Sequence, residues 1–197
     1  MALPIAARER QLKHCRHLDV QIYARSDDLW EVDAHLLDKR ERATELHGVV
    51  MPAGAVVHDL LLRLVVDAQF NVIEAGAQSQ TVPYPGACDA FAEVYERLVG
   101  LNLMHGFRAG VRERLGGVLG CTHLSELTQV LPTAVVQAFA ADAGDHPDLL
   151  RGSAVAEPVR PFQIDRCRAL RADGATVKTY YPRWYRPSSV CLSTQVA

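Results

Sequence analysis

The stretch VVHDLLLRLVVD (residues 56–67) indicates the fold most clearly. Its side chains alternate with a period of two, which is the period of a β-strand whose two faces differ in environment. One face carries Leu60, Leu62, Leu64 and Val66, and the other carries Asp59, Leu61, Arg63 and Val65. We therefore expect a strand with one face packed on a core.

Similar stretches lie on both sides of this strand. LDVQIYAR (18–25) alternates, Ser26–Asp28 supplies a turn, and LWEVDAHLLDK (29–39) alternates again. AQFN (68–71) predicts a turn into a further strand, VIEAGAQSQ (72–80). Together these stretches predict a meander of four antiparallel strands. Residues 41–54 contain Gly48, Pro52 and Gly54 without a period, and we expect a loop there that covers one end of a site.

Helical spacing follows TVPYPGAC (81–88), whose prolines and glycine end the sheet. We expect helices over residues 89–101, over residues 107–115, and from Thr122 onward with a kink at Pro132. Residues 141–161 predict a mobile loop, and residues 164–187 predict a short helix and a strand. Strands followed by helices indicate an α+β fold, an antiparallel four-stranded meander with about three helices packed on one face. A homodimer is the expected cover for the other face.

The composition limits the class of protein. A chain of 197 residues predicts a single domain over 1–197, with a core at 16–185 and an irregular tail at 186–197. A net charge of −2 argues against nucleic acid as a partner. Apolar runs are too short for a membrane span and the N-terminus lacks a signal-peptide pattern, so we expect a cytoplasmic protein. The five cysteines form no C-x-x-C pair, which argues against a disulfide framework or a standard zinc site.

The glycine-rich stretch GGVLGCTHL (116–124) is the first candidate site. Its glycines permit close backbone approach, and Thr122 is placed to cap a helix whose free N–H groups would face an anionic oxygen. Cys121 would lie next to that helix N-terminus, and His123 would be a proton acceptor or a metal ligand. Alternatively, the glycines only form a turn and His123 lies on the surface. A metal held by Cys88, Cys121 and His123, with His58 as a further ligand, is a less favoured alternative to a site without metal.

The central strand supplies three further candidates, His58, Asp59 and Arg63. Asp59 and Arg63 share a face, and buried charges must be paired, so this face could hold a polar site on the covered side of the sheet. The alternative is a solvated edge strand.

Basic and aromatic residues elsewhere are candidates for substrate binding. Tyr84 stands between two prolines, and Arg108 and Arg112 share a helix face where they could bind a carboxylate or phenolate. Arg183 and Trp184 lie in the aromatic segment YYPRWYR (180–186), which suits stacking on an aromatic ligand. Each has an alternative: Tyr84 packs on the sheet, Arg108 and Arg112 are solvated, and residues 180–186 form a terminal strap over the core.

Three motifs together resemble a bacterial family of domains of unknown function, the 2889 family. They are PYPGAC (83–88), RERLGGVLGCTHL (112–124) and YPRWY (181–185), and the resemblance covers about residues 16–185. It implies a small cytoplasmic protein without assigned catalytic residues, and a link to the breakdown of plant-derived aromatic compounds.

A looser similarity is to iron–sulfur scaffold proteins of the NifU and IscU type. Cys88 and Cys121 match two of the three cysteines of that pattern. The third, near residues 47–54, is missing, and His123 follows Cys121 where the pattern puts a histidine before the cysteine. The similarity therefore implies a shared fold and argues against cluster assembly.

These observations predict a cofactor-free enzyme, a lyase acting on a small phenolic or lignin-derived aromatic compound. Carbon–carbon cleavage releasing a small aldehyde, or an elimination, needs a base and a positive group beside the developing phenolate. The base would be His123, His58 or Asp59. The positive group would be Arg63, Arg108 or Arg112, and Tyr84 would position the ring.

The alternatives are a scaffold that binds a metal, an iron–sulfur cluster or an aromatic ligand without turnover, and an accessory subunit that docks through residues 180–186. The enzyme hypothesis requires Thr122, Arg63 and Trp184 to border one cavity.

Overall fold

The computed structural model describes residues 9–46, 48–90, 92–145 and 160–187 of the chain. Contacts divide the chain into two compact units, Met1–Val135 and Val136–Ala197, and each is described by itself. A single domain over residues 1–197 stays a prediction.

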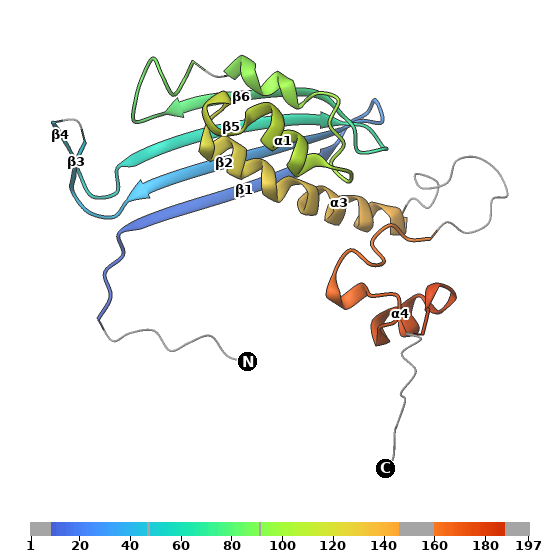
Figure 1. Ribbon diagram of the computed structural model, residues 1–197. Helices are drawn as coiled ribbons and strands as arrows, with labels where there is room; N and C mark the ends of the chain where they lie inside the picture. The colour runs from blue at the N-terminus through green and yellow to red at the C-terminus, as the bar shows by residue number, and fades with distance from the viewer. Residues whose placement is uncertain (1–8, 47, 91, 146–159, 188–197) are drawn as a thin grey trace, which may run out of the picture. The chain divides into compact units, whose positions relative to one another are not determined.

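The first unit is built on a four-stranded antiparallel sheet in the order β1-β2-β5-β6 (Figure 1). Its strands are β1 (His14–Ala24), β2 (Trp30–Arg40), β5 (Val56–Val66) and β6 (Val72–Thr81). Neighbouring strands of the sheet follow one another along the chain apart from one inserted hairpin, so the predicted meander is confirmed. The predicted α+β class is confirmed as well.

The inserted hairpin consists of β3 (Thr44–Leu46) and β4 (Val49–Met51). It lies beyond the end of the sheet between β2 and β5 (Figure 1). The prediction of a loop over 41–54 missed it, because strands of three residues are too short to display a period of two.

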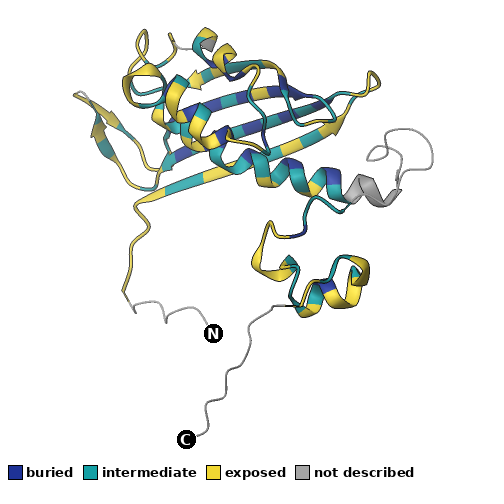
Figure 2. Cartoon of the chain, turned by 45° about the vertical axis from the view of Figure 1, so that its right-hand side comes forward, coloured by how far each residue is buried: buried dark blue, intermediate teal, exposed yellow. Residues whose placement is uncertain are grey.

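The core lies on one face of the sheet. On β2 the residues Trp30, Val32, Ala34 and Leu36 are buried, and on β5 the residues Leu60, Leu62 and Leu64 are buried, as the alternating colours along these strands illustrate (Figure 2). Helices lie over this face (Figure 1). We call it the helix-covered face, and we call the opposite face, which carries Asp33, His35, Leu61 and Arg63, the open face.

The helices of the first unit follow the sheet in order. They are η1 (Ala92–Leu98), α1 (Phe107–Leu115), η2 (Gly117–Leu119), α2 (Thr122–Leu127) and η3 (Thr128–Val130), and then α3 (Leu131–Asp145) begins. The element expected at 89–101 is a 3-10 helix, and α1 has the predicted bounds. The helix expected from Thr122 is interrupted by η3 rather than kinked, and Pro132 lies in the first turn of α3, where a missing N–H costs little.

The second unit contains the end of α3, then η5 (Arg168–Leu170), α4 (Ala175–Tyr180) and η6 (Pro182–Trp184). Residues 141–145, which we expected in a loop, are helical; residues 146–159 of that loop and residues 188–197 of the irregular tail lie outside the described residues. The short helix expected within 164–187 is confirmed, but residues 160–187 contain no strand. Among the described helices, none combines the length and apolarity needed to cross a bilayer.

Candidate functional site

Three neighbouring strands place polar side chains in one row across the helix-covered face. Arg16 of β1 is the register partner of Asp38 of β2, and Asp38 is the register partner of His58 of β5. Asp38 continues the alternation of the buried residues of β2, and His58 that of the buried leucines of β5. The pleat therefore directs these side chains toward the helices.

Asp38 is the centre of this row. Its side chain is only 1% exposed and accepts hydrogen bonds from Arg16 Nε at 2.7 Å and from Arg16 Nη2 at 2.8 Å. His58 Nδ1 lies 3.1 Å from Asp38 Oδ2, and His14 Nε2 lies 3.2 Å from Asp38 Oδ1. A buried carboxylate is tolerated when its oxygens are paired in this way.

Helix α2 brings the remaining groups to the row. His123 stacks beside His58 with ring centroids 3.8 Å apart, and its Nε2 atom lies 3.9 Å from Asp38 Oδ2. Glu126, one turn further along α2, accepts a hydrogen bond from Arg16 Nη1 at 2.5 Å. We call Arg16, Asp38, His58 and His123 the Asp38 cluster, which His14 and Glu126 flank.

The glycine-rich stretch makes the turn that allows α2 to approach the sheet. A Cβ atom at Gly116 would lie 2.3 Å from the carbonyl oxygen of Arg112, and one at Gly120 would lie 2.8 Å from that of Leu115, so neither position accepts a side chain without movement. Gly117 has a φ of +60°, which glycine adopts readily. These glycines have the structural role that we considered as the alternative.

The start of α2 differs from the expectation. Cys121 occupies the N-cap position, no side chain caps the helix, and Thr122 is already helical. The preceding turn is held by Tyr95, a fully buried residue whose hydroxyl donates to the Cys121 carbonyl and accepts from the Cys121 N–H, both at 3.0 Å. Thr122 is therefore not the cap, and Tyr95 is the residue that fixes the approach of α2.

Burial and charge shift the pKa values of the cluster. Burial raises the pKa of Asp38, but the hydrogen bonds and charge of Arg16 outweigh it and bring the pKa to about 2. The same hydrogen bonds raise the pKa of Arg16. Desolvation lowers the pKa of His58 and of His123, and the charge of neighbouring Arg16 acts in the same direction. At neutral pH the cluster thus holds an ion pair and two neutral imidazoles.

This arrangement suits proton transfer. Where His58 donates its Nδ1 proton to Asp38, its lone pair is on Nε2, which can accept a proton from a ligand. His123 offers a second imidazole at the same place. The carboxylate orients one base and stabilises its protonated form, while the guanidinium keeps the carboxylate ionised.

The cluster also contains a possible set of metal ligands. One ligand atom each from Asp38, His58 and His123 lie within 4.8 Å of one another. Two imidazoles and a carboxylate bind divalent transition metals. Arg16 occupies both oxygens of Asp38, so a metal ion would have to share them with a guanidinium. The expected set of Cys88, Cys121 and His123 differs from this one, although Cys121 Sγ lies 3.8 Å from His123 Nδ1.

Asp59 and Arg63 lie on the other side of the sheet from the cluster. They share a face as predicted, but it is the open face. Arg63 is 59% exposed and donates to both oxygens of Asp33, while Asp59 accepts from His35 Nε2 at 2.8 Å. The expected charged pair on the covered side, and the expected cavity joining Arg63 to Thr122, are therefore wrong, because alternate residues of β5 point to opposite faces.

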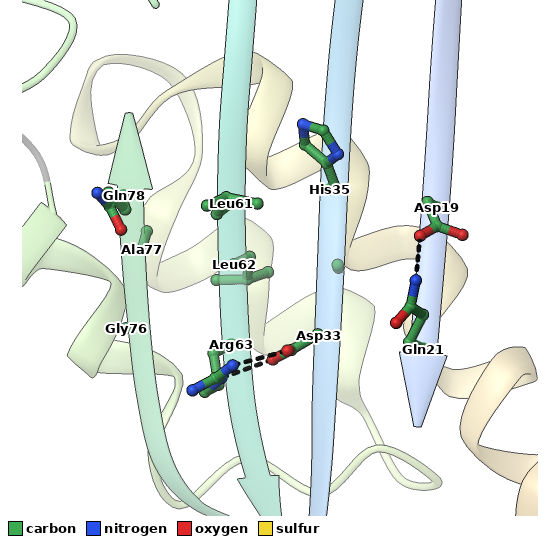
Figure 3. Close-up of a pocket in the computed structure, with 11 residues that line it drawn as sticks. Asp19, Gln21, Asp33, His35, Leu61, Leu62, Arg63, Gly76, Ala77 and Gln78 are labelled. Atoms are coloured by element: carbon green, nitrogen blue, oxygen red, sulfur yellow. Dashed lines mark hydrogen bonds and ion pairs between the residues drawn. The ribbon is translucent and has the colours of Figure 1, made fainter. Parts of the chain in front are cut away.

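The open face has a depression of its own, of about 510 Å³ (Figure 3). Asp19, Gln21, Asp33, His35, Arg63 and Gln78 contribute polar groups to its lining. Figure 3 shows Arg63 and Asp33 joined across two strands in this depression, with the helix ribbons behind the sheet.

The other predicted substrate-binding residues lie in the segment after β6, on α1 and in the second unit. Tyr84 is half exposed in the segment after β6, and Arg112 is exposed on α1. Arg108 donates to the carbonyl of Gln129 at 3.1 Å. Arg183 and Trp184 belong to the second unit, where the Arg183 guanidinium lies 5.6 Å from the centre of the Trp184 ring.

Sequence reasoning identified His58 and His123 but missed Asp38, Arg16, His14 and Glu126. A signal for Asp38 was present: it follows Trp30, Val32, Ala34 and Leu36 in the buried alternation of β2. A carboxylate in the fifth position of an apolar stripe has to find a partner. Its partner Arg16 could not be read in the same way, because β1 shows no comparable buried stripe.

Comparison with known proteins gives a family and no function. No curated protein matches the chain, and no solved structure does. The looser similarity to iron–sulfur scaffold proteins stays a prediction. The model of a family described as "Protein of unknown function (DUF2889)" matches residues 14–137, from the start of β1 into α3. This match contains every residue of the Asp38 cluster and leaves out the YPRWY motif. The chain belongs to this family of proteins of unknown function.

Proposed function

We propose that the chain is a cytoplasmic enzyme, a lyase that acts on a small phenolic or lignin-derived aromatic compound without a redox cofactor. The observation that carries the proposal is the Asp38 cluster, in which a buried carboxylate contacts a guanidinium and orients one of two adjacent imidazoles. The aromatic substrate class rests on the family resemblance.

The reaction that fits these groups is a carbon–carbon cleavage. His58 or His123 takes the proton of a primary hydroxyl group, and the hydroxyl-bearing carbon leaves as a small aldehyde. The electron pair of the broken carbon–carbon bond forms a double bond and expels an aryl ether oxygen as phenolate. The imidazolium returns its proton to that phenolate, so the products are an aldehyde, an alkene and a phenol, with no change in oxidation state overall. Where the ether oxygen is part of a ring, the alkene and the phenol remain one molecule.

Arg63 does not share a cavity with Thr122, so the proposal no longer rests on the cavity that the sequence analysis required and takes the Asp38 cluster as the site instead. The residues that supply the positive and basic groups change accordingly. Arg16 takes the part of the positive group beside the developing phenolate, which the sequence analysis gave to Arg63, Arg108 or Arg112. Asp59, on the open face, is replaced by Asp38, which orients the base rather than acting as one. A homodimer that covers the open face stays a prediction.

A second candidate function is metal binding by the same cluster. It is favoured by the 4.8 Å grouping of ligand atoms from Asp38, His58 and His123. Metal analysis of the purified protein, before and after treatment with a chelator, separates the two. Activity that survives removal of metal supports the cofactor-free enzyme, whereas activity that is lost and then restored by a divalent ion supports the second candidate.

The direct test measures aldehyde release from phenolic dimers that carry a primary hydroxyl group. We expect His58→Gln or His123→Gln to lower kcat by about 10²- to 10⁴-fold, the usual contribution of a general base. The matched control is His35→Gln, since His35 also pairs with a carboxylate but lies on the open face. Wild-type rates in both cluster variants, or an equal loss in the control, would remove the proposal.

A further inference from the structure

We propose that Arg16 is the binding site for an anionic oxygen of the ligand, a phenolate or a carboxylate, which replaces the carboxylate of Glu126. The identity of the ligand as an aromatic compound rests on the proposed function. The binding site itself is argued from the contacts of Arg16.

The two sides of the Arg16 guanidinium have different partners. Nε and Nη2 face Asp38, whose side chain is 1% exposed, whereas Nη1 faces Glu126, whose side chain is 55% exposed. Asp38 fixes the plane of the guanidinium from the buried side. The Nη1 side is therefore presented outward in a defined orientation, which is what planar recognition of an anionic oxygen needs.

Glu126 is the partner that a ligand can replace. Exposed ion pairs contribute little to stability because water solvates the separated charges well. Water cannot solvate Asp38 in the same way, because without Arg16 its carboxylate would remain a buried charge. Exchange of Glu126 for a ligand anion also replaces one negative charge by another, so the number of charges around Arg16 does not change.

The exchange would place the ligand beside the bases. His123 and Glu126 are three residues apart on α2, and such residues lie on the same side of a helix. Both contact the Asp38–Arg16 pair. A ligand oxygen that occupies the place of Glu126 therefore lies next to His123, and His123 stacks on His58.

The test uses 4-nitrophenol, which ionises near neutral pH and whose phenolate absorbs visible light. We expect wild-type protein to bind the phenolate and Glu126→Gln to bind it roughly two- to fivefold more tightly, because the competing carboxylate is gone. Arg16→Lys should weaken binding, since Lys lacks the planar fork. Neutral 4-nitroanisole should show no gain with Glu126→Gln.

Glu113→Gln is the matched control. Glu113 is exposed on α1, and its substitution removes the same charge at a different place. Equal affinity in wild type and Glu126→Gln, or an equal gain in Glu113→Gln, would overturn the proposal. Glu126→Gln alters an exposed side chain, so it decides the matter even where Arg16→Lys fails to fold. Competition by benzoate would extend the site to carboxylates, and its failure would restrict the site to phenolates. Because binding is measured without turnover, failure of the lyase proposal leaves this result intact.

Discussion

The two faces of the sheet each hold an arginine that grips a carboxylate on the neighbouring strand with two hydrogen bonds. On the helix-covered face Arg16 pairs with Asp38, and on the open face Arg63 pairs with Asp33. Asp38 is 1% exposed, whereas Asp33 is 33% exposed. Residue type and pairing geometry are thus shared, and the candidate reactive centre differs from the surface pair in its burial and in the histidines that contact Asp38.

The largest expected effect comes from removing the charge of each carboxylate in turn. Asp38→Asn leaves Arg16 without its buried partner, and we expect a loss of about 3 kcal/mol in the free energy of unfolding. Asp33→Asn should cost less than about 1 kcal/mol, because water solvates Arg63 when the pair is broken. Urea denaturation of both variants measures the difference. Similar losses would mean that burial does not distinguish the two pairs.

A tyrosine on each side gives the next comparison. Tyr95→Phe removes a hydroxyl that satisfies both the N–H and the carbonyl of Cys121, and we expect a loss of about 2 kcal/mol. Tyr23→Phe, on β1, removes a hydroxyl from a side chain that is 46% exposed, and should change stability by less than about 0.5 kcal/mol.

The same tyrosine pair is expected to differ in activity. Tyr95→Phe should lower turnover by loosening the start of α2, which carries His123, whereas Tyr23→Phe should leave turnover unchanged. Thermal denaturation checks the stabilities and the aldehyde assay checks the rates. Full activity in Tyr95→Phe would show that α2 holds its place without this contact.

The smallest expected effect is on the pH dependence of stability. The pKa values of His58 and His123 are lowered by desolvation, so the unfolded chain takes up protons first and stability falls as the pH drops below about 6.5. Asp38, with a pKa of about 2, adds a second decline as the pH falls from about 4 toward 2. The groups that face these histidines are His14, Arg16, Cys121 and Glu126.

Urea denaturation across pH 4–8 checks the first of these declines. His123→Gln should flatten it, and His35→Gln on the open face serves as the control. An unchanged decline in His123→Gln would assign it to other groups.

The sheet could be predicted from the sequence because alternation is a local signal that each strand carries by itself. Leu60, Leu62 and Leu64 fixed the face of β5 that is buried, and Trp30 and Val32 did so for β2. The bounds of α1 were predictable because the apolar spacing of a helix is also a local signal. The break at Thr128–Val130 was not, because the apolar spacing continues through it to Leu131.

The candidate site was predicted only in part, because it depends on which residues become neighbours across strands. His58 and His123 were found as isolated histidines in unusual surroundings. To predict that Asp38 and Arg16 connect them, one needs the pairing register of three strands, and that register is known only from the folded sheet. The error at Arg63 had a different source. Asp59 and Arg63 were correctly placed on one face of β5, but that face was assigned to the covered side, although the buried leucines occupy the alternate positions.

The row formed by Arg16, Asp38 and His58 shares its register with the core. A slip of one residue in β2 or β5 would turn the buried residues of that strand to solvent as well as scatter this row, so packing of the core also keeps Asp38 and His58 opposite one another. His123 and Glu126 do not depend on that register, because both lie on a six-residue helix. A change in the turn before α2 can therefore alter the chemistry of the cluster without disturbing the sheet beneath it.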